Sequence, residues 1–304
     1  MECIRDEKSG RLVCRSEELE VHIETARGMD ISRASFQGVD IGWLRPGALG
    51  PVEDGYDDEL QERSMFFGLL TTCGLENAGP SCRDGEFFFC RHGSINWNRA
   101  EKLSFGMEGD VLLIKGTIPS LRFSSPLLLH REIRIDPARN SISLRDRVEN
   151  SGVAEEQLCI MYHYNFGAPF LGPDCRINIP ASHVRPKNEA AERVMDKRYE
   201  VSAPDENAQP VVFYHEYSDK YAKVQKSTIE NPALGIKVEL LCRSCSLPML
   251  DLWKDLRLGR YVLSLEPCNM FPYGRIKQRQ QKLARFVQPG GMEEFETEIV
   301  FMRI

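Results

Sequence analysis

The chain lacks a long apolar run and an excess of basic residues. No stretch approaches the roughly 20 apolar residues needed to cross a bilayer, and the charged start MECIRDEKSGRLVCRSEE contains no secretory apolar segment. The 39 Lys and Arg residues are outnumbered by 45 Asp and Glu residues, which gives a net charge of −6 and argues against a polyanionic partner. We therefore expect a soluble cytoplasmic protein that binds no nucleic acid and no membrane.

A disulfide framework and a phosphate-binding loop are also absent from the pattern. The sequence has ten cysteines, but its length permits a sizeable core and no export signal is visible, so we expect reduced thiols. The pair Cys242 and Cys245 has CxxC spacing without a second pair, which favours inert thiols. The Gly-rich segment GLLTTCGLENAGP lacks the GxxxxGK[ST] pattern of a phosphate-binding loop.

Sustained helical periodicity, repeats and low-complexity tracts are scarce. Short alternating or apolar runs recur instead between turn residues, among them VLLIKGTI, LLLHREIRI, SISLRDRVEN and IKVELLC. This pattern predicts an all-β sandwich or barrel, and the length allows one domain over residues 1–304. The polar residues 185–210 favour a surface insertion with one short helical piece over an interdomain linker. A turn at Pro289–Gly291 predicts a C-terminal strand that closes a sheet.

The first chemistry-bearing candidate is His163 in the segment MYHYNFGAP. An imidazole holds a proton near neutrality and can transfer it to an oxygen, while the neighbouring aromatic rings can stack against a sugar. For an isolated histidine, a half-buried side chain satisfied by the backbone is the simpler interpretation. His163 needs a partner before it indicates catalysis.

The second candidate is Glu266, which follows the apolar run YVLSL and precedes Pro267. Its position near a strand end allows the carboxylate to face either a cleft or water. Asn269, Tyr273 and Arg275 follow closely and offer an amide, a phenol and a guanidinium suited to sugar hydroxyls. These neighbours favour the cleft.

Two further segments carry candidate substrate contacts. Asn77 and His92 lie in Gly-rich turns from which short polar side chains can reach a ligand. In LPMLDLWKDL, Trp253 offers a stacking platform and Lys254 a cation for a hydroxyl or a phosphate. Ordinary connecting loops, a core tryptophan and a solvated lysine remain the structural alternatives. Cys90 and His92 would need distant residues to complete a metal site, and we expect none.

In their order along the chain, these segments resemble the aldose 1-epimerase (galactose mutarotase-like) superfamily, and especially its DUF4432-type branch. The resemblance implies a β-supersandwich of large antiparallel sheets with a sugar in an open concave cleft. By motif match it implies that His163 protonates the ring oxygen, that Glu266 removes the anomeric hydroxyl proton and that His92 helps to hold the substrate. Asn77 matches a substrate contact of the family, but Ala78 follows where the galactose enzymes carry Arg, which argues against galactose.

We therefore expect a mutarotase that interconverts the α and β anomers of a free monosaccharide without a metal or other cofactor. Histidine and glutamate side chains ordinarily titrate far enough apart for imidazolium and carboxylate to coexist. One alternative is a metal-dependent, cupin-like sugar isomerase with His92, His163 and Glu266 as ligands. Another is a non-catalytic carbohydrate-binding module. The sequence leaves open which sugar is bound, whether it is phosphorylated, and the oligomeric state.

Overall fold

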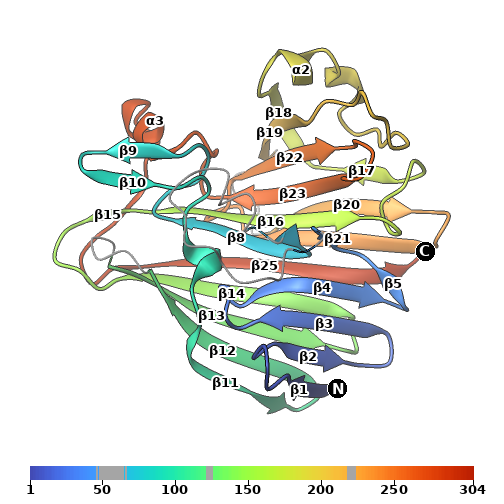
Figure 1. Cartoon of the computed structure of the whole chain (residues 1–304), viewed down its shortest axis with the longest axis horizontal. Coiled ribbons are helices and arrows are strands. Elements are labelled where there is room, and N and C mark those ends of the chain that lie inside the picture. The colour runs from blue at the N-terminus through green and yellow to red at the C-terminus, as the bar shows by residue number, and fades with distance from the viewer. Residues whose placement is uncertain (46, 48–64, 66, 121–125, 218–223) are drawn as a thin grey trace.

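Two large antiparallel sheets make up most of the chain (Figure 1). The computed structural model describes residues 1–45, 47, 65, 67–120, 126–217 and 224–304. Within these ranges the first sheet has 11 strands, in the spatial order β1 (Glu2–Arg5), β2 (Leu12–Arg15), β3 (Leu19–Glu24), β4 (Asp30–Phe36), β8 (Leu70–Leu75), β16 (Cys159–Gly167), β23 (Val262–Cys268), β22 (Met249–Asp255), β19 (Val211–Tyr217) and β18 (Ala181–Pro186), with β5 (Val39–Asp40) beside β4.

The second sheet has eight strands in the described part of the chain, ordered β11 (Glu101–Glu108), β12 (Val111–Pro119), β13 (Leu127–Asp136), β14 (Ser141–Asn150), β25 (Met292–Arg303), β21 (Ile236–Cys242), β20 (Gln225–Asn231) and β17 (Arg176–Asn178). Small two-stranded pairs join β6 (Trp43–Leu44) to β7 (Phe67–Gly68), β9 (Cys82–Asp84) to β10 (Phe87–Phe89), and β15 (Glu156–Gln157) to β24 (Phe286–Val287). The all-β prediction is confirmed. The C-terminal strand β25 lies inside its sheet, between β14 and β21.

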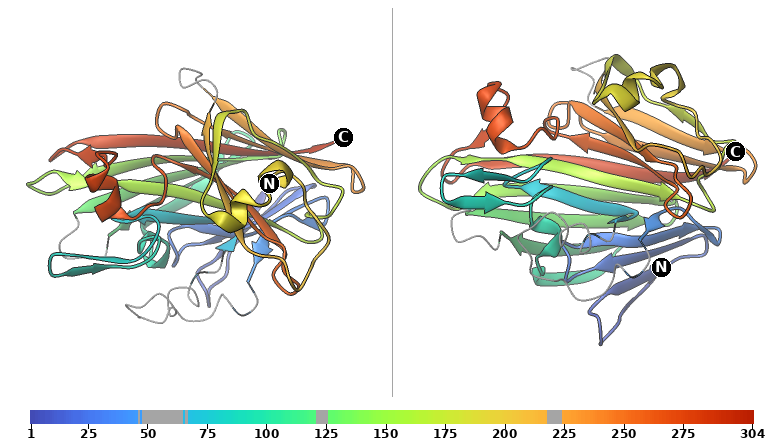
Figure 2. Two further views of the ribbon diagram at one scale, coloured as in Figure 1. Left: turned by 90° about the horizontal axis from the view of Figure 1, so that it is seen from above. Right: turned by 45° about the horizontal axis from the view of Figure 1, so that its top comes forward.

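The core lies between the two sheets, which the turned views show as stacked layers (Figure 2). Strand β13 illustrates how the sequence produces this packing, since Leu127, Leu129, Ile133 and Ile135 are buried and alternate with more exposed residues. Successive side chains of a strand point to opposite faces, so this alternation places one apolar face against the other sheet.

A buried ionic network crosses the core. Arg131 on β13 donates hydrogen bonds to Asp30 on β4 and Asp146 on β14, with nitrogen–oxygen distances of 2.8 and 2.6 Å. It also donates to the Thr72 hydroxyl on β8 (2.8 Å), and the Tyr162 hydroxyl on β16 donates to Asp146 (2.8 Å). One guanidinium thus binds two buried carboxyl groups, and the network joins strands of both sheets.

Strands β8, β16 and β23 depart from simple alternation, because all their residues are buried on both faces. One face of each strand packs into the core. The opposite face lies at the centre of the larger sheet and is also buried. We call it the protected surface, because polar side chains there are held away from bulk water.

The polar segment 185–210 contains two short helical pieces, where the sequence predicted one. Strand β18 ends at Pro186 and is followed by the short helices α2 (Glu189–Glu192) and η2 (Met195–Lys197), which lie beside β19 in Figure 1. The helices η1 (Ile95–Trp97) and α3 (Arg275–Gln280) are equally short. None of the helices in the described ranges has the length and apolar character needed to span a membrane. The ten cysteines are all free thiols.

Candidate active site

Strand register brings the principal candidates into one row on the outer face of the larger sheet. Thr71 on β8 lies opposite His163 on β16, and Asp251 on β22 lies opposite Glu266 on β23. In the ladder between β16 and β23, Met161 pairs with Cys268 and Tyr164 with Leu265, and this register places His163 opposite Glu266. Directly opposed residues of antiparallel strands project from the same face. Four neighbouring strands therefore present Thr71, His163, Glu266 and Asp251 side by side.

The imidazole of His163 and the carboxyl group of Glu266 contact each other directly. The Nε2–Oε1 distance is 3.0 Å, and the two side chains are only 7% and 5% exposed. The other ring nitrogen, Nδ1, lies 2.6 Å from the Asn165 carbonyl oxygen Oδ1. The Asn165 amide nitrogen donates to the His163 backbone carbonyl (2.8 Å), which orients the amide so that Oδ1 faces the ring.

These contacts bear on which nitrogen atoms of His163 carry hydrogen. Asn165 Oδ1 only accepts, so Nδ1 of His163 carries a hydrogen. A hydrogen on Nε2 as well gives an imidazolium that faces the carboxylate of Glu266, which also accepts a short hydrogen bond from the Ser264 hydroxyl. In that protonation state the arrangement places a proton donor and a proton acceptor side by side on this buried face, as general acid–base chemistry requires.

Aromatic rings line the pair. The Trp253 ring lies 5.6 Å from the His163 ring, and Phe67 lies 5.7 Å from His163, both at steep angles. Trp253 and Phe67 stack on each other with centroids 5.9 Å apart. A small apolar cluster that includes Met161 and Cys268 lies beside them. Such a platform suits the apolar face of a sugar ring.

His92 approaches the same place from the loop after β10. Its ring lies 6.4 Å from that of His163. The loop is tied to β8, because the Gly74 amide donates to the His92 carbonyl (2.8 Å). A Cβ atom on Gly93 would lie 2.1 Å from the Gly74 carbonyl oxygen, so only glycine permits this approach. The close contact explains the His–Gly dipeptide in the sequence.

The electrostatic surroundings keep His92 neutral. Burial, with the nearby positive charges of His163, Arg91 and Lys187, lowers the pKa of His92 to about 3. Its buried Nδ1 has no hydrogen-bond partner within the described ranges. A neutral imidazole with an unused nitrogen can accept from or donate to a sugar hydroxyl, according to its tautomer.

Two other predicted substrate contacts, Asn77 and Asn269, engage the protein itself. The Asn77 amide donates to the carbonyls of Pro80 (3.0 Å) and Cys90 (2.8 Å) and accepts from the Arg275 amide (2.9 Å). Asn269 joins β23 to β16, because its oxygen accepts from the Ile160 amide at 2.9 Å. These side chains brace the segments around the site, and the structure does not bring them to the His163–Glu266 pair.

Arg275 has a similar bracing role. Its guanidinium donates to Asp84 (3.0 Å) and to the Glu76 carbonyl (2.8 Å), and it lies 4.0 Å over the ring of Phe89. The sequence placed it near sugar hydroxyls because it follows Glu266 closely. The chain turns away after β23, however, so proximity along the sequence does not carry the guanidinium to the pair.

Lys254 requires a correction. It follows Trp253 in β22, and successive residues of a strand point to opposite faces. Its ammonium group donates to the carbonyls of Lys197 (3.0 Å) and Glu200 (2.9 Å) and lies over the Phe213 ring. Burial lowers its pKa to about 8. Lys254 therefore does not share the surface of Trp253, contrary to the expectation from sequence.

The structure adds residues that the sequence interpretation missed. Ser264 and Asp251 each lie two positions before a candidate, Glu266 and Trp253 respectively, and therefore project from the same face. Phe67 completes the aromatic platform. The alternation of strand residues could have identified Ser264 and Asp251, whereas Phe67 shows no such signal.

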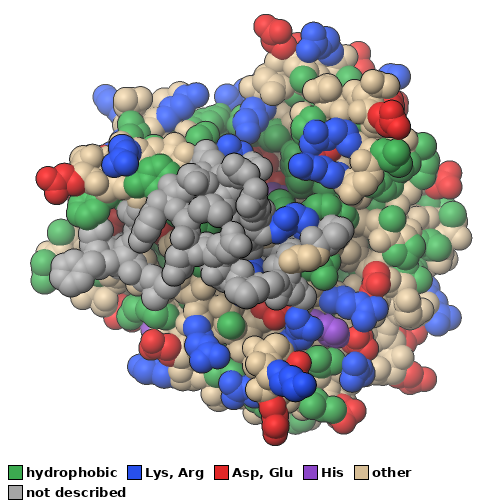
Figure 3. All heavy atoms as spheres, in the orientation of Figure 1, with side chains coloured by type: hydrophobic (Ala, Val, Ile, Leu, Met, Phe, Trp, Pro, Cys, Tyr) green, Lys and Arg blue, Asp and Glu red, His purple; other side chains and the backbone are tan. Residues whose placement is uncertain are grey.

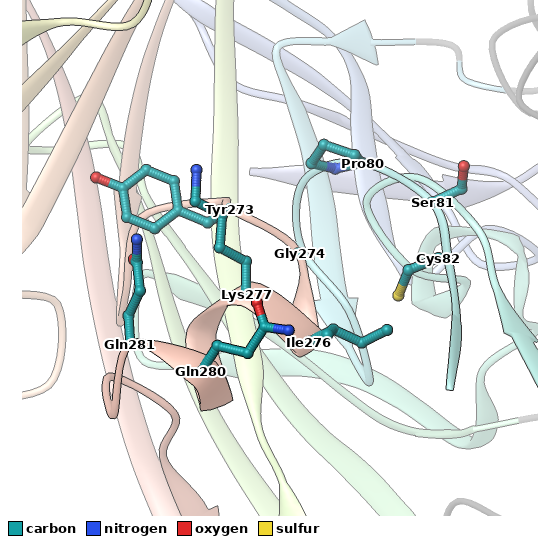
Figure 4. A pocket seen from close by; sticks show the side chains of 9 residues that line it. All are labelled: Pro80, Ser81, Cys82, Tyr273, Gly274, Ile276, Lys277, Gln280 and Gln281. Carbon is teal, nitrogen blue, oxygen red and sulfur yellow. The ribbon is translucent and has the colours of Figure 1, made fainter. Parts of the chain in front are cut away.

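A separate hollow of about 310 Å³ lies where α3 meets the segment before β9 (Figure 4). Its lining includes Pro80, Cys82, Tyr273 and Lys277 and contains none of the acid–base candidates. The hollow is thus distinct from the His163–Glu266 pair.

On the face shown in Figure 3, basic side chains gather around the centre of the molecule.

The donor arrangement does not form a recognisable metal centre. In the ranges that the structure describes, no three or more His, Cys, Asp or Glu side chains are placed to hold a metal ion. His163 and Glu266 are hydrogen-bonded to each other instead. The metal-ligand set proposed from the sequence as an alternative therefore gains no support from the geometry.

Solved structures share this architecture. A protein described as a candidate aldose 1-epimerase from Klebsiella pneumoniae subsp. pneumoniae superposes with a TM-score of 0.89 at 23% identity, over 97% of this chain and 80% of the other. A galactose mutarotase-like protein from Clostridium acetobutylicum gives 0.68 at 14% identity, over 97% and 95%. Galactose 1-epimerase from Lactobacillus acidophilus gives 0.64 at 11% identity, over 99% and 98%.

At these identities the similarity establishes the fold, which is the galactose mutarotase-like β-supersandwich predicted from sequence. Among curated proteins, none matches the chain. One family model matches residues 9–300, nearly the whole chain. The chain therefore belongs to the family described as Domain of unknown function (DUF4432).

Proposed function

We propose that this protein is an aldose 1-epimerase that interconverts the anomers of a monosaccharide. The observation that carries the proposal is the 3.0 Å contact between His163 Nε2 and Glu266 Oε1 on a protected, aromatic-lined face. The hydroxyl oxygen and the ring oxygen at the anomeric centre are bonded to one carbon. An acid and a base that act on these two oxygens must therefore lie close together, as this pair does.

The proposed reaction moves two protons and breaks one bond. The Glu266 carboxylate accepts the proton of the anomeric hydroxyl, the His163 imidazolium donates a proton to the ring oxygen, and the bond between the anomeric carbon and the ring oxygen breaks. Rotation about the adjacent carbon–carbon bond exposes the other face of the aldehyde. The reverse transfers close the ring as the other anomer and restore both residues.

The surrounding groups have separate tasks in this proposal. Asn165 holds the ring orientation and the Nδ1 hydrogen of His163, and Ser264 holds the Glu266 carboxylate. Trp253 and Phe67 support the apolar face of the sugar. Neutral His92 offers its unused nitrogen to a hydroxyl.

We also propose that the whole chain forms one sugar-binding domain. The family model spans residues 9–300, and the larger sheet combines strands from the first forty residues with β22 and β23 from beyond residue 248. Neither half of the chain contains a complete copy of that sheet in the described structure.

Anomer exchange measured by NMR or polarimetry on a panel of free and phosphorylated monosaccharides tests the proposed activity. We expect catalysis of at least one sugar, and a loss of about 10²- to 10⁴-fold in His163→Ala and in Glu266→Gln. The chain supplies a matched control: His130 and Glu149 form a similar pair (2.9 Å) on the smaller sheet, so His130→Ala and Glu149→Gln should retain activity.

Two results would contradict the proposal. Full activity in both His163→Ala and Glu266→Gln would remove these residues from the mechanism. Binding of a sugar without acceleration of its anomer exchange would instead identify a carbohydrate-binding module.

A further inference from the structure

Two thiols face each other at the border of the larger sheet. Cys3 on β1 lies directly opposite Cys14 on β2 in their antiparallel ladder, and their sulfur atoms are 3.0 Å apart. Both residues are free thiols in the structure. Within the described chain β1 pairs with β2 alone, so the thiol pair joins the outermost strand of this sheet to its single neighbour.

The backbone of this hairpin is compatible with a disulfide. Directly opposed residues of antiparallel strands have Cα atoms about 4.5 to 5.5 Å apart, within the range of about 4.4 to 6.8 Å found across disulfides. Their side chains also project from the same face of the sheet. The register of β1 on β2 therefore brings the two sulfur atoms together, and a bond between them needs no change in strand pairing.

The two thiols have different surroundings. Cys14 is 0% exposed and belongs to the core between the sheets, whereas Cys3 is partly exposed on the border strand. A hydrogen bond from Cys14 lowers the pKa of Cys3, and the same contact together with burial raises the pKa of Cys14. A dissolved reagent therefore reaches Cys3 first, and Cys3 is also the thiol that ionises more readily.

We propose that Cys3 and Cys14 form a modification site that reacts with small-molecule disulfides, such as glutathione disulfide, and closes into a disulfide between β1 and β2. Cys3 is the attacking thiol and Cys14 is the resolving thiol. Strands β2, β3, β4 and β8 separate β1 from β16, which carries His163. The proposal is therefore independent of the proposed anomer exchange.

The reaction consists of two thiol–disulfide exchanges. The Cys3 thiolate attacks one sulfur of glutathione disulfide, so that a Cys3–glutathione bond forms and one glutathione thiolate leaves. Cys14 then loses its proton to solvent, its sulfur attacks the Cys3 sulfur, and the second glutathione leaves as a thiolate. Both glutathione thiolates are in equilibrium with their thiols. In total, two protein thiols are oxidised and one small disulfide is reduced to two thiols.

The product holds a short border strand in place. Strand β1 has four residues, of which Glu2, Ile4 and Arg5 are exposed. Such strands open locally at low cost in free energy. A disulfide closes residues 3–14 into a ring and restricts the opened state, so we expect amide hydrogen exchange in β1 to slow about tenfold or more.

Peptide mapping of the parent protein tests the site directly. Trypsin cuts after Arg5, Arg11 and Arg15, and the resulting peptides 1–5 and 12–15 each contain one cysteine. After incubation of the folded protein with glutathione disulfide, alkylation of free thiols and digestion without reductant, we expect these two peptides to be linked. The linked pair should exceed the Cys3–glutathione adduct about tenfold.

Three variants assign the roles. In Cys14→Ser the resolving thiol is missing, so the Cys3–glutathione adduct should accumulate, whereas Cys3→Ser should give neither this adduct nor the link. Cys245→Ser is the matched control, because Cys245 is an exposed thiol outside the hairpin; it should form the link as the parent does. If Cys14→Ser does not fold, the peptide map of the parent still decides the question.

Two outcomes would overturn the proposal. One is a parent protein that keeps the Cys3–glutathione adduct without the link, or that links Cys3 to Cys245 as often as to Cys14. The other is unchanged amide exchange in β1 after the link has formed, which would show that the bond does not restrain the strand. Reduction with dithiothreitol should restore both the free peptides and the original exchange rate.

Discussion

The buried arginine that joins the two sheets provides a direct test of how the fold is held together. In Arg131→Met, Asp30 and Asp146 lose the guanidinium that binds both, and neither side chain is exposed to solvent. Removing one partner of a buried ion pair typically costs about 3–5 kcal/mol, because the remaining charge stays buried without compensation. We expect a loss of at least this size in the free energy of unfolding.

The pH dependence follows from the carboxyl groups. Burial raises the folded-state pKa of Asp30 to about 6 even with Arg131 present. A carboxyl with a raised pKa favours the folded state below its unfolded pKa of about 4, and that contribution is lost as pH rises through 6. Without Arg131 the pKa rises further, so the defect of Arg131→Met should be smallest near pH 4 to 5 and largest above pH 7.

Denaturant unfolding at several pH values measures both effects. A matched variant, Arg134→Met, removes a partly exposed arginine from the same strand and should cost less than about 1 kcal/mol. A loss of less than 1 kcal/mol in Arg131→Met, or a defect that does not change with pH, would refute the assignment of buried, uncompensated carboxylates.

Two further predictions concern the surroundings of the site. Gly93→Ala places a Cβ atom 2.1 Å from the Gly74 carbonyl oxygen at a backbone φ of 73°, so we expect the His92 loop to be displaced. Titration should then show weaker sugar binding, and denaturation should show a lower unfolding midpoint. Unchanged values for both would contradict the close approach. Trp253→Ala should raise KM for the accepted sugar by about tenfold, whereas Lys254→Met, on the opposite face of the same strand, should leave KM unchanged; equal effects would contradict the assignment of the two faces.

The candidate site residues show which features of the site could be predicted from local sequence. His163 and Glu266 were identified because each stands out chemically within a strand-like run, and the structure brings them together although about a hundred residues separate them. Lys254 was grouped with Trp253 because the two are adjacent, but adjacency in a strand means opposite faces. Asn77, Asn269 and Arg275 are polar and near the right motifs, yet their hydrogen bonds go to the protein.

The all-β architecture could be predicted from local sequence, since alternating apolar residues and turn residues are visible in the chain. The sequence also determined which residue types were available for acid–base chemistry. Which of these residues meet depends on the complete fold, because strand order and register are set by the packing of two whole sheets. That packing placed Asp251 beside Glu266, left both side chains almost completely buried, and turned Lys254 away from the site.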